Sequence, residues 1–426
     1  MRYSNKKINT FKNNLILPKS FYIVIIGDSI SRIGDYIYQL GIPIYILSLT
    51  GSPLWMATSF AIQQCAIIFS GLLSGTVVDR SNPKKVLVYN ALLQTILIAV
   101  IPILHKLSMI NIYFILIDGF FLTASGFLYK TAINSLIPNI VKKERLPLAS
   151  SQISLSKFIS KTIGPTLAGI VISVISPINS LWIDGISFLL VFVLMKFVDF
   201  NDEVKIQIKD KNTIKSFTRD LQEGFKIVLG TDFIFSLVIL NFMLNIGYVS
   251  MFSMFIYHLS EILNFQSQTI GLIYSADGLA VIMAGFLLPI IMKKIMNGKL
   301  IIYCSAIMGL CILSLGYISS GLLVGGIFGI IMYCSQTINR VMYTLWQMNI
   351  SKEQLGRVFS ISSTLESLSV PLAGMISGII VENYESFTLF KISGIIIILS
   401  TLLCTIFTKV TQIDNRIVYE KNTMLK

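Results

Sequence analysis

The chain has 426 residues, of which 54% are apolar and only 13% are charged. A soluble domain carries about 25% charged residues, so this chain has too few to coat a water-exposed surface. The formal net charge of +13 would suit a nucleic-acid partner, but no basic stripe interleaved with aromatic residues and no nucleic-acid-binding motif is present. The composition therefore excludes a soluble globular protein and predicts no nucleic-acid partner.

Twelve apolar blocks, each long enough to cross a hydrocarbon core as a helix, follow one another along the chain. The block after the basic N-terminal segment has no small-residue cleavage site behind it, so we expect an uncleaved first helix and not a signal peptide. The predicted helices cover residues 20–48, 53–78, 86–105, 109–137, 150–175, 179–198, 231–258, 267–292, 299–319, 321–345, 356–381 and 386–408.

Lysine and arginine residues are concentrated in every second connection between these predicted helices. The two termini and every second loop hold 27 of them, whereas the opposite loops hold only Lys106. Cytoplasmic loops of membrane proteins carry the excess of basic residues, so the pattern predicts that both termini are cytoplasmic. A missed or invented helix would reverse the alternation from that point onwards, and no reversal occurs.

The longest loop lies between the sixth and seventh predicted helices and divides the chain into six helices plus six. We expect an N-terminal half over residues 1–198, a cytoplasmic linker over 199–230 and a C-terminal half with a short tail over 231–426. Apolar residues at helical spacing over 213–229 predict an amphipathic linker helix on the inner membrane face.

A weak internal repeat agrees with this division. Lys143-Glu-Arg-Leu precedes the fifth predicted helix, and Lys352-Glu-Gln-Leu precedes the eleventh. Each copy is followed by a proline and a Leu-Ala-Gly sequence inside the helix, on the same predicted side of the membrane. Such a repeat predicts two parallel halves of six helices each.

Metal and nucleotide chemistry have little support in the sequence. The two histidines, His105 and His258, lie near predicted outer helix ends, and no GxxxxGK(S/T) phosphate-binding loop is present. We therefore expect no metal site, no cofactor and no ATP-driven transport by this chain alone. The cysteines lie in apolar blocks without a CxxC pair and are predicted to be reduced core residues: Cys65, Cys304, Cys311, Cys334 and Cys404.

The loop after the second predicted helix carries the strongest motif. It has Gly75, then Asp79 and Arg80, then Lys84 and Lys85, in the pattern GxxxDRxxxKK. Glycine permits a close helix approach, an aspartate can cap or pair with a helix end, and basic residues hold the loop at an anionic leaflet. The pattern resembles motif A of the major facilitator superfamily, which implies a latch between the halves during alternating access.

The fifth predicted helix contains Gly164, Pro165, Ala168 and Gly169, which is similar to the GPxxGG core of motif C in the antiporter branch of that superfamily. Proline interrupts the backbone ladder, and small residues permit tight helix packing. Motif B is absent, because residues 115–126 contain no arginine. This departure puts the family's proton-relay arginine in doubt for this chain.

Three further segments resemble the macrolide-efflux-like branch of drug and metabolite exporters, so that the resemblance covers essentially the whole chain. It implies an all-α major facilitator fold and a transporter, not an enzyme, in the cytoplasmic membrane of a bacterium. The branch includes siderophore exporters, so the substrate stays open. The segments are Gly27-Asp-Ser-Ile-Ser-Arg-Ile-Gly-Asp35, Leu49-Thr-Gly-Ser-Pro53 and Leu355-Gly-Arg-Val358.

Charged residues inside the predicted spans are the candidate site residues. An unpaired charge at the bilayer centre costs about 2.5–3.5 kcal/mol, so these residues must pair, snorkel, line water or have a function. The acids are Asp28, Asp35, Asp118, Asp184, Asp277 and Glu366, and the bases are Arg32, Lys130, Lys157, Lys161, Arg340 and Lys391. Depth assigns a structural role to Lys130 and Lys157 near inner ends and to Asp184 and Lys391 near outer ends.

Asp28, Arg32 and Asp35 share one face of the first predicted helix, because their spacing is i, i+4 and i+7. Arg32 can neutralise one of the two acids but not both at once. Asp35 lies about fifteen residues into the helix, which is roughly 22 Å at 1.5 Å per residue. We rank it first as a proton carrier; the alternative is a permanently paired triad with only a packing role.

Four other residues complete the candidate set. Asp28 and Glu366 follow Asp35 as candidates for proton coupling, and Asp118 and Asp277 come next. Each of the last two is equally well explained as a satisfied polar core residue. Arg32 and Arg340 are the expected charge partners, and Arg340 can either contact an anionic substrate or pair with an acid.

Motifs and charges together favour a proton-coupled antiporter that exports an amphiphilic drug or secondary metabolite, either macrolide-like or siderophore-like. A proton-coupled importer or a lipid transporter on the same fold is the alternative, and a non-transporting membrane receptor or immunity protein is a third hypothesis. An intramembrane enzyme is not favoured, because no paired-aspartate or HxxxxD arrangement is present. The expected partners are the small-molecule substrate, protons and the lipid bilayer, and we expect a monomer.

Overall fold

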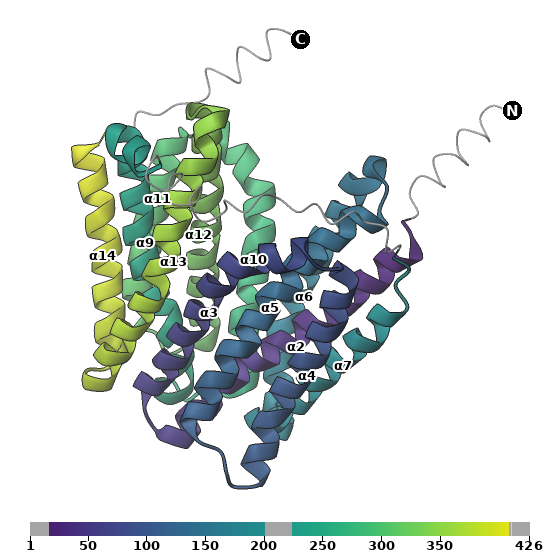
Figure 1. The fold of residues 1–426 in the computed structure, drawn as a ribbon. Coiled ribbons are helices and arrows are strands. Elements are labelled where there is room, and N and C mark those ends of the chain that lie inside the picture. Colours follow the sequence, from purple (N-terminus) through teal and green to yellow (C-terminus); the bar gives the residue numbers. More distant parts are fainter. Residues whose placement is uncertain (1–16, 201–223, 409, 411–426) are drawn as a thin grey trace, which may run out of the picture. The chain divides into compact units, whose positions relative to one another are not determined.

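The computed structural model describes residues 17–200, 224–408 and 410, and all regular structure in these ranges is helical (Figure 1). A 3-10 turn, η1 (Lys143–Arg145), and a π-helical turn, η2 (His258–Ile262), accompany the long helices. The long helices in the described ranges are twelve in number: α2 (Lys19–Thr50), α3 (Pro53–Asp79), α4 (Pro83–Lys106), α5 (Ile112–Ile140), α6 (Leu146–Ile175), α7 (Pro177–Lys196), α9 (Asp232–Tyr257), α10 (Ser267–Met292), α11 (Asn297–Leu315), α12 (Gly321–Asn349), α13 (Lys352–Asn383) and α14 (Ser386–Phe407).

The length and apolar character of these helices suit a membrane. Within the described ranges, eleven helices are long and apolar enough to span a bilayer. The remaining long helix, α2, has 32 residues and carries Lys19, Asp28, Arg32 and Asp35. The prediction of an all-α membrane protein with twelve long helices is therefore confirmed, while the cytoplasmic location of both termini stays a prediction.

Proline and capping residues set several of the helix boundaries. Gly51 has a φ of 66°, a left-handed conformation that favours glycine, and it separates the end of α2 from Pro53 at the start of α3. Asn82 caps α4, where its side-chain oxygen accepts hydrogen bonds from the backbone N–H groups of Lys84 and Lys85. These short connections follow directly from local sequence chemistry.

Backbone contacts divide the chain into two compact units. The first comprises Met1–Tyr45 with Cys65–Lys209, and the second comprises Ile46–Gln64 with Asp210–Lys426. The domain boundaries predicted from the sequence stay a prediction. Most of the predicted amphipathic helix, residues 213–223, lies outside the described residues, and residues 224–230 are helical.

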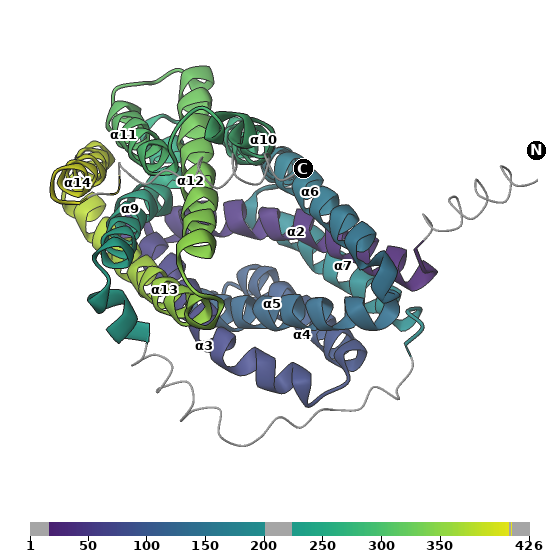
Figure 2. The ribbon, with the colours of Figure 1, turned by 90° about the horizontal axis from the view of Figure 1, so that it is seen from above.

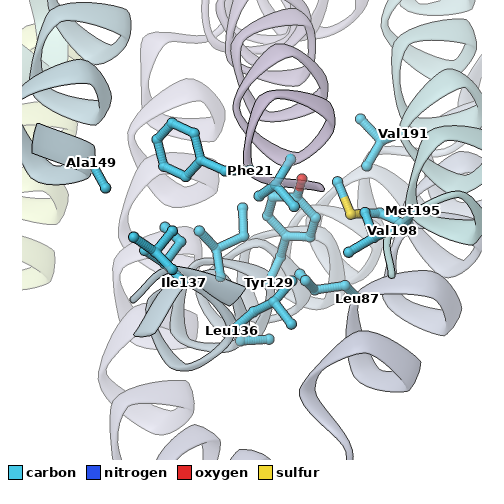
Figure 3. Close-up of a cluster of buried hydrophobic side chains, with 14 of the residues drawn as sticks. Phe21, Leu87, Tyr129, Leu136, Ile137, Ala149, Val191, Met195 and Val198 are labelled. Atoms are coloured by element: carbon cyan, nitrogen blue, oxygen red, sulfur yellow. The ribbon is translucent and has the colours of Figure 1, made fainter. Parts of the chain in front are cut away.

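The core of the first unit is formed by apolar side chains from α2, α4, α5 and α7. Figure 3 shows Phe21, Leu87, Leu136, Val191 and Met195 grouped in this core, and each is at most 1% exposed. In a bilayer, association of helices depends on close packing and not on escape from water. The fit of these side chains therefore holds the first unit together.

Helix order in the second unit follows from pairwise contacts. Successive neighbours are α10, α12, α11, α14, α9 and α13, as the view from above shows (Figure 2). Glycines make the α11–α14 contact close, because a Cβ at Gly394 would lie 2.8 Å from the backbone oxygen of Gly309. Aromatic rings fill another contact, where Phe255 of α9 stacks on Phe328 of α12 with centroids 4.7 Å apart.

The start of α3 is attached to α13 within the second unit. Oε2 of Glu382 accepts a hydrogen bond from the Ser52 hydroxyl at 2.8 Å and one from the Leu54 backbone N–H at 3.2 Å. A carboxylate is favourable at a helix N-terminus because the first N–H groups have no partner inside the helix. A Cβ at Gly378 would collide with Ala57, so the two helices also pack without space for a side chain.

We expect Gly394→Ala to lower the free energy of unfolding by about 1–3 kcal/mol, because its methyl group would press on a backbone atom that cannot rotate away. The measurement is unfolding in mixed micelles of dodecyl maltoside and sodium dodecyl sulfate. Gly326→Ala in α12 is the matched control, since no described atom lies within 4 Å of its Cβ position. Equal stability of the two variants would contradict the close α11–α14 contact.

Candidate functional site

The charged face of α2 contains a direct ion pair. Nε of Arg32 donates to Oδ2 of Asp28 at 2.7 Å, one helical turn away. The Asp28 side chain is 8% exposed and the Arg32 side chain is 27% exposed, so the pair is only partly solvated. Asp35 makes no hydrogen bond to any residue in the described ranges. Asp28 and Arg32 are thus paired in the structure, whereas Asp35 has no hydrogen-bonded partner of this kind.

A second acid lies beside Asp35 on α7. A Cβ at Gly34 would collide with Oδ1 of Asp184, so α2 and α7 touch at the residue that precedes Asp35. Asp184 is fully buried and accepts a hydrogen bond from the Ser187 hydroxyl at 3.4 Å. The sequence predicts a structural role for Asp184 near an outer helix end. It contacts Gly34 and lies within electrostatic range of Asp35, so the two acids are neighbours between α2 and α7.

Asp118 belongs to the same polar region of the first unit. It is buried on α5, within electrostatic range of the Tyr38 hydroxyl on α2, as is Asp184. Among the described residues, Oδ2 of Asp118, Oδ2 of Asp184 and the Tyr38 hydroxyl have no hydrogen-bond partner. Buried polar atoms without partners are uncommon, so this region is a candidate for proton or substrate binding.

Glu366 is the centre of a separate polar cluster in the second unit. Its Oε1 accepts hydrogen bonds from the Asn241 side-chain amide and, at 2.9 Å, from the Ser362 hydroxyl. Nδ2 of Asn245 donates to the Glu366 backbone oxygen at 3.2 Å and to the Ser369 hydroxyl at 3.0 Å. Through these bonds α9 and α13 are joined around one carboxyl group.

Neither asparagine was among the residues predicted from the sequence. Asn241 and Asn245 are one helical turn apart in an otherwise strongly apolar helix, and this spacing places both amides on one face. That pattern was the available signal. The sequence could not reveal that the face meets Glu366, because the two segments are 125 residues apart.

Asp277 and Arg340 lie on α10 and α12 of the second unit. Asp277 is half-buried and within electrostatic range of the hydroxyl groups of Tyr248 and Tyr274. Arg340 points towards α10, because its Nη1 atom lies 3.5 Å from the Cβ position of Gly285. These neighbours show where the two side chains lie. The roles of Asp277 in proton coupling and of Arg340 as a charge partner stay predictions.

The motif A loop connects the end of α3 to the start of α4. Asn82 is the residue that caps α4, whereas Asp79 is exposed and makes no hydrogen bond or ion pair to any described residue. No described atom lies within 4 Å of the Cβ position of Gly75, and a close helix approach there stays a prediction. Nζ of Lys84 donates to the backbone oxygen of Lys196 at 3.4 Å and so connects this loop to the end of α7. Arg80 and Lys85 are exposed.

The motif C-like segment lies in the middle of α6 and is tightly packed. Gly164, Pro165, Ala168 and Gly169 are all buried. A Cβ at Gly164 would collide with the ring of Tyr36 on α2. The small residue therefore permits the close approach of α6 to α2, as expected for a helix-packing glycine.

The histidines have structural partners. Nδ1 of His105 shares a hydrogen bond of 2.8 Å with the Tyr45 hydroxyl, and Nδ1 of His258 shares one of 2.8 Å with the Ser386 hydroxyl. Among the residues that the structure describes, no group of three or more His, Cys, Asp or Glu side chains could hold a metal ion. The polar sites of the two units are built from carboxyl, amide and hydroxyl groups instead.

Comparison with known proteins identifies the family. The model of the Major Facilitator Superfamily matches residues 24–347. The chain belongs to this superfamily. Macrolide efflux protein A of Streptococcus pyogenes is 22% identical over 404 residues, with 92% of this chain and 97% of the relative covered. An uncharacterised transporter of the same superfamily, YvqJ of Bacillus subtilis strain 168, is 20% identical and covers 80% of this chain and 81% of its own length.

A solved structure supports the fold. The structure of a bacterial homologue of the iron transporter ferroportin in an inward-facing state has a TM-score of 0.72 and 14% identity, and the match covers 92% of this chain and all of that chain. At this identity the likeness concerns the fold alone. The superfamily and its efflux relatives establish a multi-pass membrane transporter of a small molecule, not an enzyme.

Removing Arg32 should leave Asp28 as an unpaired, nearly buried charge. We expect Arg32→Met to destabilise the protein by about 1–3 kcal/mol, less than the roughly 3–5 kcal/mol of a fully buried pair because Arg32 is partly solvated. Adding Asp28→Asn should recover at least half of this loss, because it removes the orphaned charge. Unfolding in mixed micelles measures both, and additive losses in the double variant would contradict the pairing.

Proposed function

We propose that this transporter exports an amphiphilic small molecule in exchange for protons, by alternating access in the cell membrane. The observation that carries the proposal is Asp35, a carboxyl group deep in α2 without a hydrogen bond to any described residue, one turn beyond the Asp28–Arg32 pair. The efflux proteins among the relatives support the outward direction. A cytoplasmic membrane location and a monomeric state belong to the same proposal.

A carboxyl group with no fixed partner is suited to carry a proton. It can bind or release the proton without breaking a hydrogen bond that holds two helices together. Arg32 is hydrogen-bonded to Asp28 and lies within electrostatic range of Asp35 as well, so its hydrogen bond can pass to Asp35 when Asp28 is neutral. Protonation of either acid thus changes which partner Arg32 has, and this links proton occupancy to the arrangement of α2.

Glu366 is the candidate for a second coupling group. Because its carboxyl oxygen accepts bonds from Asn241 and Ser362, a change in its protonation would alter contacts between α9 and α13.

Each elementary charge that crosses the membrane is worth about 2.3 kcal/mol per 100 mV, so one or two protons supply enough free energy to concentrate a substrate. The exposed basic loop with Arg80 and Lys85 is the proposed latch during this cycle.

The central test is proton-driven flux in liposomes that contain Asp35→Asn. Antiport moves substrate towards the acidic side, so we expect acid-inside liposomes with the wild-type protein to accumulate compounds from a panel of dyes, macrolides and siderophores. Asp35→Asn should lose at least about 90% of this accumulation, because the amide cannot release a proton, while exchange of labelled for unlabelled substrate continues. Protein-free liposomes correct for passive trapping of weak bases.

Asp232→Asn is the matched control, because it removes an exposed carboxylate from the first turn of α9. It should accumulate substrate like the wild type. Normal accumulation in Asp35→Asn would remove that residue from the coupling path and direct the same test to Glu366→Gln. Accumulation only in acid-outside liposomes would show symport and contradict the proposed exchange.

A further inference from the structure

A pocket in the first unit opens between α2, α5 and α6. It is a shallow, open pocket: its empty volume of about 360 Å³ includes the open space outside its mouth, and its enclosed part has room for about one water molecule. Its polar lining consists of Asp28 and Arg32 from α2, Lys130 and Asn134 from α5, and Lys157 from α6. The rest of its wall is apolar, with Phe21 and several aliphatic side chains. One pocket therefore combines an apolar wall with a cluster of charges from three helices.

Positive charge exceeds negative charge in this pocket. Three cationic side chains line it, but only one carboxylate, and Asp28 is bonded to Nε of Arg32. The Nη atoms of Arg32 and the ammonium groups of Lys130 and Lys157 donate no hydrogen bond to any described residue. Lys157 is within electrostatic range of Arg32, Lys130 and Asp28. Like charges that line one pocket repel each other, and a bound counter-anion would relieve this repulsion.

Snorkelling alone does not account for this arrangement. Lys130 and Lys157 are exposed and lie towards the predicted inner ends of their helices, so each could reach the headgroup region separately. Two snorkelling lysines on a bilayer surface would be free to diverge. Instead they line one pocket with an arginine whose free nitrogens form a planar fork, the geometry that suits carboxylate and phosphate oxygens.

We propose that this pocket binds the anionic group, a carboxylate or phosphate, of an amphiphile whose apolar part packs against the half-buried side chains of Ile25 and Ile153. The proposal rests on the export function and gives the cargo its chemical class. Arg32 binds one oxygen pair of the anion, and Lys130 and Lys157 neutralise the rest of its charge. An inside-negative membrane potential drives negative charge outward, in agreement with export. The site favours an acidic, siderophore-like cargo over a cationic, macrolide-like one.

The test is a binding measurement on the full chain in nanodiscs of phosphatidylcholine. The probes are dansylaminoundecanoic acid and its methyl ester, which differ only in the anionic group, and empty nanodiscs correct for partitioning into lipid. We expect the wild type to bind the acid at least about tenfold more tightly than the ester, as expected for charge-assisted hydrogen bonds. Lys157→Gln and Lys130→Gln should each reduce this preference to about threefold or less.

Lys106→Gln is the matched control, because it removes a positive charge from an exposed residue of the same unit that does not line the pocket. It should keep the full preference for the acid. Gel filtration and thermal melting show whether each variant is folded. Each lysine variant tests the proposal independently, so one folded variant is enough for the test. Equal binding of acid and ester by the wild type, or an unchanged preference in the folded lysine variants, would overturn the proposal.

Two sources of the anion are separated by adding phosphatidylglycerol to the nanodiscs. If this lipid leaves acid binding unchanged, the pocket selects the cargo, as proposed. If it displaces the acid from the wild type but not from Lys157→Gln, the resident anion is a lipid headgroup and the cargo proposal is overturned. Selective acid binding without proton-driven flux would support the pocket while contradicting the exchange function, so the two proposals can fail separately.

Discussion

A charged or polar group in hydrocarbon has no water to bind, and the helices of this protein are arranged under that constraint. The two units meet it in different ways. In the first unit a local ion pair on α2 joins Asp28 to Arg32 one turn away. In the second unit, amide and hydroxyl donors from α9 and α13 surround the single carboxyl group of Glu366. Both arrangements keep an ionisable group inside a helix bundle at moderate cost.

The difference between the two arrangements matters for conformational change. An i,i+4 pair lies within one helix, so α2 can move as a rigid element without breaking it. The Glu366 cluster connects two helices, so movement of α9 against α13 must break or exchange hydrogen bonds. A proton on Glu366 therefore acts on a helix contact, whereas a proton on Asp28 or Asp35 acts on the charge balance of one helical face. In the proposed exchange, proton coupling therefore takes a different physical form in each unit.

The sequence predicted what depends on local chemistry. Every membrane span must satisfy its own backbone hydrogen bonds, so apolar length alone located twelve helices. Helical spacing placed Asp28, Arg32 and Asp35 on one face, and the small residues around Gly164 correctly indicated tight packing. These properties need no knowledge of which helices are neighbours.

The rest depends on contacts between helices, which periodicity does not encode. The sequence did not reveal that Asp184 touches Gly34, that Asn241 binds Glu366, or that Lys130 and Lys157 line one pocket with Arg32. At the motif A loop, the pattern allowed Asp79 either to cap a helix end or to pair with one, and in the structure the side-chain oxygen of Asn82 satisfies the N–H groups of α4. An asparagine directly before a proline at a helix start is a strong local capping signal, and it was available.

The bond between Glu382 and the start of α3 has a consequence for biosynthesis. Ser52 and Glu382 are 330 residues apart, so the ribosome completes α3 long before α13 exists. Until then the N–H groups at the start of α3 have no carboxylate, and the surface around Ala57 has no helix against it. The early part of the chain is therefore in the bilayer before α13 is made, and lipid or another protein must cover the surface of α3 that later packs against α13. Assembly of the second unit is complete only after nearly the whole chain has been inserted.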